Sequence, residues 1–175
     1  RPLRVRSGAA TAADGAEMWR LAQRTSLDRN SPYAYVLWGD HFARTSRIAL
    51  DDEGMVGFLT GHVVPDRPDT LFVWQVGVAD RARGHGVASL LLDEVWAATP
   101  GLRFLEATVT PSNAASDRLF RSFGERHGAP LHTEVAYGEH LFPGDDHEAE
   151  VRYRVGPVAH GEAHEHRHDD NPVGT

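Results

Sequence analysis

A short glycine loop lies between an apolar strand and an apolar helix in residues 71–95, LFVWQVGVADRARGHGVASLLLDEV. Gly84 and Gly86 let the backbone approach an anion without side chains in the way. The free N–H groups of the following helix turn supply donors and a positive dipole end. Arg81 and Arg83 add positive charge beside the loop. These residue types in this order predict a binding site for a phosphate or pyrophosphate group.

Two kinds of phosphate loop contain a G-x-G core. A dinucleotide loop of the form G-x-G-x-x-G is disfavoured, because Ser89 holds the third glycine position and only one strand-helix-strand crossover follows. The acidic residue that such a site needs after the next strand could only be Glu106, which lies inside LEATVT. The spacing Arg81-x-x-Gly84-x-Gly86 instead resembles the acyl-CoA pyrophosphate loop of the GNAT N-acetyltransferase superfamily.

A second pattern, one strand later, strengthens this resemblance. In PSNAASDRLFRSFG, residues 111–124, Asn113, Leu119 and Gly124 occupy the places of the superfamily helix N-x-x-[AS]-x-x-L-[YF]-x-x-x-G. An ordinary capped amphipathic helix is also compatible with this segment, because Asn113 is a natural N-cap and an apolar stripe follows it.

The GNAT resemblance implies that acetyl-CoA is the co-substrate and that no metal is required. The residues that it assigns to cofactor binding are Val76, Gly77, Val78, Arg81, Arg83, Gly84, His85, Gly86, Val87, Ala88 and Asn113. The chain has no cysteine, and its 18 basic residues are all arginine. Thiol nucleophiles and Schiff-base lysines are therefore excluded, so the acceptor amine is expected to attack the thioester directly.

Carboxylates and aromatic rings elsewhere in the chain suit a small cationic acceptor. The predicted acceptor-binding residues are Asp28, Trp74, Asn113, His147 and Glu150, with Tyr33 and Tyr35 as further aromatic faces. Each of these has a structural alternative. Asp28 could cap the following turn, and Trp74 could be a core residue that shares its strand face with Phe72 and Val76. The histidine and the glutamate could lie on a solvated edge.

Four blocks of sequence resemble one GNAT branch, the L-2,4-diaminobutyrate acetyltransferases of ectoine biosynthesis. The blocks are LDRNSPYAY (27–35), RPDTLFVWQVGV (67–78), FLEATVTPSNAAS (104–116) and HEAEVRYRVGP (147–157). This resemblance implies acetyl transfer from acetyl-CoA to the 4-amino group of the diamino acid, whose product is later cyclised to the compatible solute ectoine. It also implies a homodimer.

An aliphatic ammonium has a pKa of about 10 by analogy with lysine, so the acceptor must lose a proton before it attacks. Glu150 and His147 are the predicted bases, acting directly or through water. A backbone N–H of residues 76–78 is expected to meet the oxyanion, because superfamily members hold the thioester where their strands splay just before the loop.

The acid that protonates the leaving thiolate is not evident from the sequence. Many superfamily members carry a tyrosine in the Asn113 helix, but here Phe120 stands at that place and cannot donate a proton. Tyr33, Tyr35, Tyr137 or water are the alternatives, and a tyrosine of NSPYAY is favoured. A CoA thiolate is also a fair leaving group without any acid.

Composition and hydropathy bound the remaining possibilities. A chain of 175 residues with 41% hydrophobic residues suits one globular domain. The formal net charge of −7 argues against nucleic acid as a partner. The sequence has no apolar run long enough to span a membrane and no secretory signal pattern, so we expect a cytoplasmic protein without membrane contact.

Periodicity predicts an α/β fold of the GNAT kind, with a mixed, mostly antiparallel central sheet and helices on both faces. The expected strands are 3–6, 46–52, 55–64, 71–79, 104–110, 131–137 and 150–156, and the expected helices are 11–25, 30–44, 86–98 and 113–126. A turn around Asp52, Glu53 and Gly54 predicts a hairpin.

We expect a GNAT domain in residues 1–156 and a disordered, His-rich tail in residues 157–175, which is rich in charge and poor in apolar residues. Such a tail could bind Zn²⁺ or Ni²⁺, so a metal-buffering protein is one alternative function. Another small amine, such as a polyamine, an amino acid or an aminoglycoside, is an alternative acceptor. A CoA-binding regulator without catalysis is the third alternative, because of Phe120.

Overall fold

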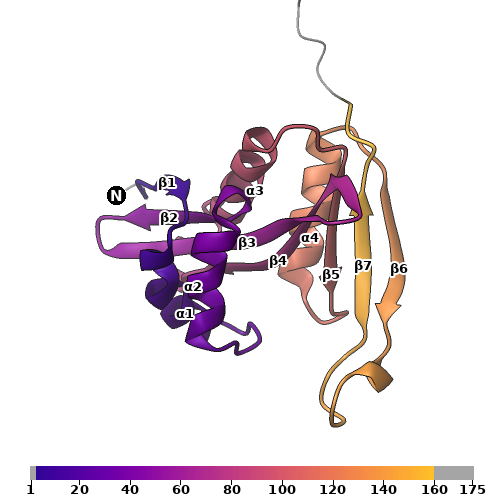
Figure 1. Cartoon of the computed structure of the whole chain (residues 1–175), viewed down its shortest axis with the longest axis horizontal. Coiled ribbons are helices and arrows are strands. Elements are labelled where there is room, and N and C mark those ends of the chain that lie inside the picture. The colour runs from indigo at the N-terminus through magenta and orange to yellow at the C-terminus, as the bar shows by residue number, and fades with distance from the viewer. Residues whose placement is uncertain (1–2, 160–175) are drawn as a thin grey trace, which may run out of the picture.

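A computed structural model of the chain describes residues 3–159. Seven strands are joined by four α-helices and four short 3₁₀ turns (Figure 1). The strands are β1 (Arg6–Ala9), β2 (Arg47–Asp51), β3 (Gly54–Val64), β4 (Arg67–Val78), β5 (Phe104–Val109), β6 (Leu131–Tyr137) and β7 (Glu150–Val155). The helices are α1 (Gly15–Gln23), α2 (Pro32–His41), α3 (Val87–Ala98) and α4 (Ala114–Arg126).

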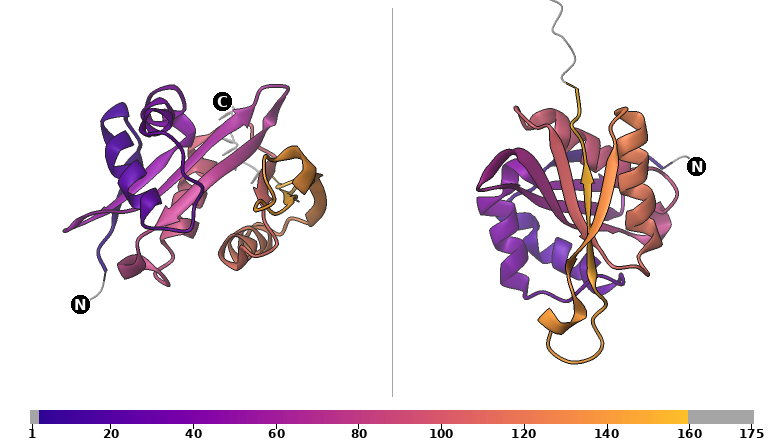
Figure 2. Two further views of the ribbon diagram at one scale, coloured as in Figure 1. Left: turned by 90° about the horizontal axis from the view of Figure 1, so that it is seen from below. Right: turned by 90° about the vertical axis from the view of Figure 1, so that its right-hand side faces the viewer.

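The strands form one sheet in the order β1-β2-β3-β4-β5-β7-β6. Only the pairing of β4 with β5 is parallel, and the other five pairings are antiparallel. Helices α1 and α2 cover one face, and α3 and α4 cover the other (Figure 2, right). The predicted fold class, a mixed and mostly antiparallel sheet with helices on both faces, is confirmed.

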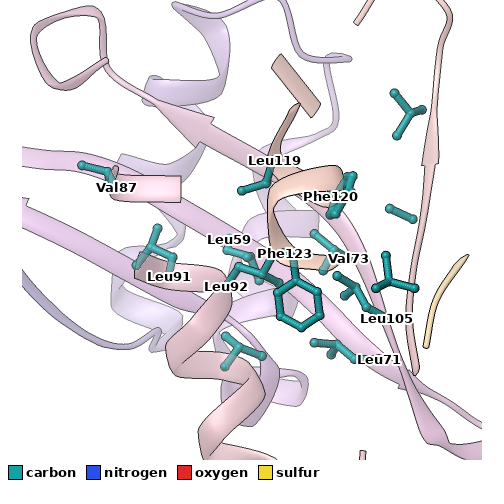
Figure 3. Close-up of a cluster of buried hydrophobic side chains, with 14 of the residues drawn as sticks. Leu59, Leu71, Val73, Val87, Leu91, Leu92, Leu105, Leu119, Phe120 and Phe123 are labelled. Carbon is teal, nitrogen blue, oxygen red and sulfur yellow. The ribbon is translucent and has the colours of Figure 1, made fainter. Parts of the chain in front are cut away.

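The main hydrophobic core lies between the sheet and helices α3 and α4 (Figure 3). The apolar stripes read from the sequence supply it: Leu91 and Leu92 from α3, and Leu119 and Phe123 from α4, are buried there. A second, smaller cluster joins α1 and α2 to the other face through Met18, Tyr35 and Phe58, among others. The two clusters fix the sheet from both sides and thereby fix the strands that carry the predicted site.

Local signals placed most elements within a few residues. Ser31 caps α2 by accepting a hydrogen bond from the backbone N–H of Ala34, and Pro32 is the first helical residue. The predicted capping box is present, since the carboxylate of Asp14 accepts from both the backbone N–H and the hydroxyl of Thr11. It opens the 3₁₀ turn that leads into α1. The hairpin between β2 and β3 is also confirmed.

The predicted start of the fourth strand was wrong. The polar segment PDRPD (65–69) lies between the expected strands 55–64 and 71–79, but β4 begins at Arg67, which pairs with Val64 of β3 across a two-residue turn. Arg67 forms an ion pair with Glu106 of β5. This contact between residues far apart in sequence gives the polar segment a partner that local propensity cannot reveal.

The expected tail lies almost wholly outside the described residues. Only residues 157–159 of it belong to residues 3–159, and there Val158 is buried against the main core and donates a backbone hydrogen bond to Arg103. The hydrophobic core therefore includes Val158, which the sequence had placed in the expected tail. Within residues 3–159, no helix has the length and apolar character needed to cross a membrane.

Candidate functional site

A β-bulge and a splay between strands open the middle of the sheet. Thr60 of β3 pairs with Gln75 and the next residue, Gly61, pairs with Val73, so Trp74 is the extra residue of a bulge in β4. The parallel pairing of β4 with β5 is confined to residues 70–73 of β4. Beyond it the two strands diverge, as the resemblance to the GNAT superfamily implied.

The bulge excludes the alternative in which Trp74 is a core residue. Val76 packs against the main core with Leu71 and Val73, whereas Phe72 and Trp74 face a cavity on the opposite side of the sheet. Trp74 is 53% exposed, so it is not a core residue. It does not share a face with Val76, because one extra residue reverses the two-residue alternation of a strand.

The first cavity, which we call the splay cavity, lies where β4 diverges from β5 and has a volume of about 600 Å³. It is lined by the end of β4, the glycine loop, the start of α3 and the first turns of α4. Of the predicted cofactor residues, its lining contains Val76, Gly77, Val78, Arg83, Gly84, Gly86, Val87, Ala88 and Asn113.

The glycine loop has the backbone that its sequence predicts. Gly84 and Gly86 have φ angles of +76° and +73°, which are costly for residues with a Cβ. A Cβ at either position would point into open space, so the loop leaves room for a ligand against its backbone. Gly86 is also the N-cap of α3, whose first N–H groups lie at this end of the helix. These residues fit a pyrophosphate group.

The structure separates the two arginines of the loop. Arg83 lines the splay cavity. Arg81 does not line it and instead forms hydrogen-bonded ion pairs of 3.0 Å with Asp51 of the neighbouring hairpin. This contact lowers the pKa of the Asp51 carboxyl to about 2, mainly through the hydrogen bond from Arg81. His85, the third polar residue of the loop, is exposed and also lies outside the cavity lining.

The second cavity, which we call the sheet-face cavity, has a volume of about 400 Å³ and lies on the face of the sheet beside α1 and α2. It contains every predicted acceptor-binding residue. Its lining residues are Ser26, Leu27, Asp28, Phe72, Trp74, Gln75, Thr108, Thr110, Asn113, Tyr137, Phe142, His147 and Glu150. Asn113, Ser26 and Leu27 line both cavities, so the two meet at the splay.

Asp28, His147 and Glu150 form an acidic group around one imidazole. Nε2 of His147 lies 3.9 Å from a carboxylate oxygen of Asp28 and 3.8 Å from one of Glu150. Nδ1 of His147 lies 2.6 Å from the carbonyl oxygen of Glu148, which fixes that nitrogen as the donor. Phe142 stacks on the imidazole with 3.7 Å between ring centroids. The ring is therefore held with Nε2 toward both carboxylates.

Glu150 lies at the first position of β7, with 16% of its side chain exposed. Burial raises the pKa of its carboxyl, which the charge of His147 and a hydrogen bond with Thr108 partly oppose. A raised pKa brings a carboxylate closer to the basicity that proton abstraction near neutral pH needs. Its position and its pKa both suit a general base.

The two predicted tyrosines are not brought into the cavities. Tyr33, in the first turn of α2, is 67% exposed and lines neither cavity. Tyr35 is 1% exposed, and burial raises the pKa of its hydroxyl. It donates a hydrogen bond of 2.8 Å to the side chain of Gln75, whose amide donates to the backbone carbonyl of Asp28. This placement makes Tyr35 a support for the Asp28 loop.

Phe120 is buried in the main core, where its ring packs against that of Tyr153. The hydroxyl of Tyr153 donates a hydrogen bond of 2.6 Å to the carboxylate of Asp117. Neither residue lines the splay cavity. Tyr137 lines the sheet-face cavity and is the one tyrosine of the described residues that does so.

Gln75, Thr108, Thr110 and Phe142 line the site although their sequence context did not predict it. A signal existed for two of them, because Glu106, Thr108 and Thr110 alternate with apolar residues along β5 and so share one face. Phe142 lies in the loop between β6 and β7, which has no periodicity. Gln75 directly follows the bulge, which the sequence did not reveal.

No group of three or more His, Asp or Glu side chains with the geometry to hold a metal ion occurs within residues 3–159. The Asp28, His147 and Glu150 group places two carboxylates in the lining of the sheet-face cavity and so suits an ammonium ligand. Its charges face a cavity with an aromatic wall, an arrangement that stabilises ammonium groups.

Residues 15–124 match the model of the acetyltransferase (GNAT) family. The chain is also similar to curated L-2,4-diaminobutyric acid acetyltransferases. That of Streptomyces coelicolor is 49% identical over 154 residues, which cover 85% of this chain and 91% of the relative. That of Halalkalibacterium halodurans is 43% identical, with 86% of this chain and 81% of the relative covered.

Solved structures extend the comparison. The diaminobutyrate acetyltransferase of Paenibacillus lautus, in complex with its substrate L-2,4-diaminobutyric acid and coenzyme A, superposes with a TM-score of 0.87. It is 41% identical, and the match covers 93% of this chain and all of that one. The ribosomal-protein-S18-alanine N-acetyltransferase of Escherichia coli superposes with a TM-score of 0.67 at 19% identity, which is a similarity of fold alone.

Proposed function

The chain belongs to the acetyltransferase (GNAT) family and, within it, to the L-2,4-diaminobutyric acid acetyltransferases, and we propose that it transfers acetyl from acetyl-CoA to the 4-amino group of L-2,4-diaminobutyrate. The observation that carries the proposal is that the two cavities share lining residues, Asn113 among them, and that Glu150 lines the sheet-face cavity with Asn113. An amine held by Glu150 lies at the opening toward the splay cavity, where the thioester would be bound.

The glycine loop and the start of α3 are the proposed site of the CoA pyrophosphate. Backbone N–H groups at Gly84, Gly86 and Val87 supply donors, and Arg83 supplies a positive charge at the rim. Arg81 acts indirectly, by tying the loop to Asp51. The acyl end then extends along residues 76–78 of β4, which line the same cavity.

Glu150 is the proposed general base. It removes a proton from the 4-ammonium group, directly or through water, and the amine nitrogen then attacks the thioester carbonyl carbon. His147 is held by Phe142 and by the backbone carbonyl of Glu148, and it keeps the carboxylate of Glu150 in place. Its charge opposes the rise in the pKa of Glu150 that burial causes. Asp28 and Trp74 are the proposed partners of the second ammonium group, through an ion pair and the indole face.

The forming C–N bond places negative charge on the carbonyl oxygen. A backbone N–H within residues 76–78 is the proposed donor to this oxyanion, because these residues line the splay cavity just before the loop. When the C–S bond breaks, the thiolate leaves with its electron pair, and the acylated nitrogen loses its second proton to water to give the neutral amide. Water is the proposed proton source for the thiolate, since Phe120 has no proton to donate and no tyrosine of residues 3–159 lines the splay cavity.

The position of the acetyl group tests this assignment. With acetyl-CoA and L-2,4-diaminobutyrate as substrates, we expect NMR of the product to show one acetamide, bonded to the nitrogen on C4. A product acetylated on the 2-amino group would reverse the proposed orientation in the sheet-face cavity. An unmodified amino acid would contradict the reaction class.

We also propose that the enzyme is a homodimer. Strand β6 is an edge of the sheet, and the large apolar side chains of Val135, Tyr137 and Leu141 are exposed on it and on the following turn. An exposed edge of this kind is a natural contact surface. Sedimentation velocity at micromolar concentration should give twice the chain mass, and a purely monomeric boundary would contradict the proposal.

A further inference from the structure

The charges around the sheet-face cavity are unevenly distributed along the sheet. At the splay end, the ionisable lining residues are Asp28, His147 and Glu150. This set suits the two ammonium groups of a diamino acid. L-2,4-Diaminobutyrate also carries a carboxylate, and no arginine lines the cavity among residues 3–159. A group beyond this lining must therefore meet the carboxylate.

An arginine cluster lies on the same face, one step further along the strands. Glu150, Arg152 and Arg154 alternate along β7 and so share one face of the sheet. Arg152 pairs with Thr108 of the neighbouring strand β5, and Thr108 lines the cavity. Arg154 pairs with Glu106 of the same strand. The face thus changes from acidic to basic within two strand positions, about 7 Å of strand.

Glu106 is the centre of this cluster. It is 2% exposed, and Arg67, Arg152 and Arg154 all form ion pairs with it. Glu134 of β6 accepts a second contact from Arg152, with 3.0 Å between the two side chains. Three guanidinium groups thus meet two carboxylates, so the cluster carries one more positive charge than negative.

Arg152 is the member of the cluster that lies next to the cavity lining. It is two positions from Glu150 on the same face of β7 and pairs with Thr108 of β5, and Glu150 in turn pairs with Tyr137 of β6, another lining residue. Arg154 is directed elsewhere, since its guanidinium lies over the ring of Phe104, 3.8 Å from the centroid. An arginine has five donors in a planar fork, so Arg152 can keep its carboxylate partners and still bind a ligand carboxylate.

We propose that Arg152, together with the Tyr137 hydroxyl, binds the substrate carboxylate and selects an amino acid over a simple diamine. This inference rests on the proposed function. Four covalent bonds separate the 4-amino nitrogen of diaminobutyrate from its carboxyl carbon. An extended substrate with that nitrogen at Glu150 therefore directs its carboxylate up the sheet toward Arg152, and its 2-ammonium group remains beside Asp28 and Trp74.

The experiment compares kcat/KM for L-2,4-diaminobutyrate and for 1,3-diaminopropane, which is the same skeleton without the carboxylate. The wild-type enzyme should prefer the diamino acid. In Arg152→Gln, kcat/KM for diaminobutyrate should fall about ten- to hundred-fold, the scale of a lost charge-assisted hydrogen bond, while that for diaminopropane changes by less than about threefold. The preference for the amino acid should therefore collapse.

Arg154→Gln is the matched control. Arg154 contacts the same Glu106 and is as exposed as Arg152, at 29% against 31% of the side chain. Its replacement costs the cluster the same charge, but it should leave the ratio of the two kcat/KM values unchanged. Tyr137→Phe leaves all the arginines in place and should lower the same ratio about two- to tenfold, so the test does not depend on Arg152→Gln folding.

Three results would overturn the inference. These are equal losses on both substrates in Arg152→Gln, an unchanged ratio in both Arg152→Gln and Tyr137→Phe, and a wild-type enzyme that uses the two substrates equally well. A wild-type enzyme that releases no CoA with diaminobutyrate would instead contradict the proposed function, so the two failures are distinguishable.

Discussion

Replacement of Glu150 by glutamine is expected to lower kcat/KM for L-2,4-diaminobutyrate by roughly one to three orders of magnitude. Glutamine keeps the shape of the side chain at the start of β7 but removes the charge that holds the ammonium group and accepts its proton. The KM for acetyl-CoA should hardly change, because Glu150 lines the sheet-face cavity and not the splay cavity. Steady-state kinetics with each substrate varied in turn measures both effects.

The pH profile separates a base from an anchor. Only the carboxylate form of Glu150 can accept a proton, and burial raises the pKa of this carboxyl. Acceptor kcat/KM should therefore fall as the pH is lowered through that raised pKa. In Glu150→Gln this acidic limb should disappear. In the wild-type enzyme a base gives an acidic limb in kcat as well, whereas a pure anchor gives it in kcat/KM alone, because bound substrate keeps the anchoring carboxylate ionised.

Glu148→Gln is the matched control. Glu148 lies two residues away, and its carboxylate contacts the hydroxyl of Ser112 outside the sheet-face cavity. This variant removes the same charge near the site and should retain most of the activity. Wild-type kinetics in Glu150→Gln would contradict the proposed role of Glu150 as a base or anchor. Asp28 would then be the acidic residue proposed to bind the acceptor.

Replacement of Gly86 by valine is expected to raise the KM for acetyl-CoA by about tenfold or more. Gly86 has a φ of +73°, which a β-branched residue resists, and the added side chain would occupy the open space against which a pyrophosphate would lie. Isothermal titration of CoA into the folded variant measures the effect directly.

Gly101→Val separates strain from lost binding. Gly101 has a φ of +80°, and a Cβ there also meets open space, but the residue follows α3 and lines neither cavity. Both variants should lower the thermal midpoint, while only Gly86→Val should weaken CoA binding. Unchanged CoA affinity in a folded Gly86→Val protein would show that the pyrophosphate lies elsewhere.

The cofactor side of the site could be predicted from sequence because its determinants are local. A backbone with positive φ favours glycine, so Gly84 and Gly86 could be predicted from their type and spacing. The start of a helix favours a capping residue, so Asn113 could be predicted in the same way. Arg81 did not follow this rule. Its type and position predicted a phosphate contact, but its partner is Asp51, 30 residues away.

The acceptor side depends on features that sequence periodicity does not encode. The bulge at Trp74 adds one residue to β4. The alternation of side chains between the two faces of the sheet therefore reverses after it. Phe142 reaches the cavity from a loop, and Glu106 is held by arginines from two other strands. The tyrosines of NSPYAY were close to the site in sequence, but the packing of α2 buries one and exposes the other.

The measurement that tests the central claim most directly is the initial rate of CoA release from acetyl-CoA over a panel of acceptors. The acidic and aromatic cavity and the similarity to diaminobutyrate acetyltransferases predict a faster rate with L-2,4-diaminobutyrate than with ornithine, lysine, spermidine or kanamycin. Ornithine is the closest control, since it differs by one methylene. Comparable rates with a polyamine or an aminoglycoside, and none with diaminobutyrate, would contradict the proposed acceptor.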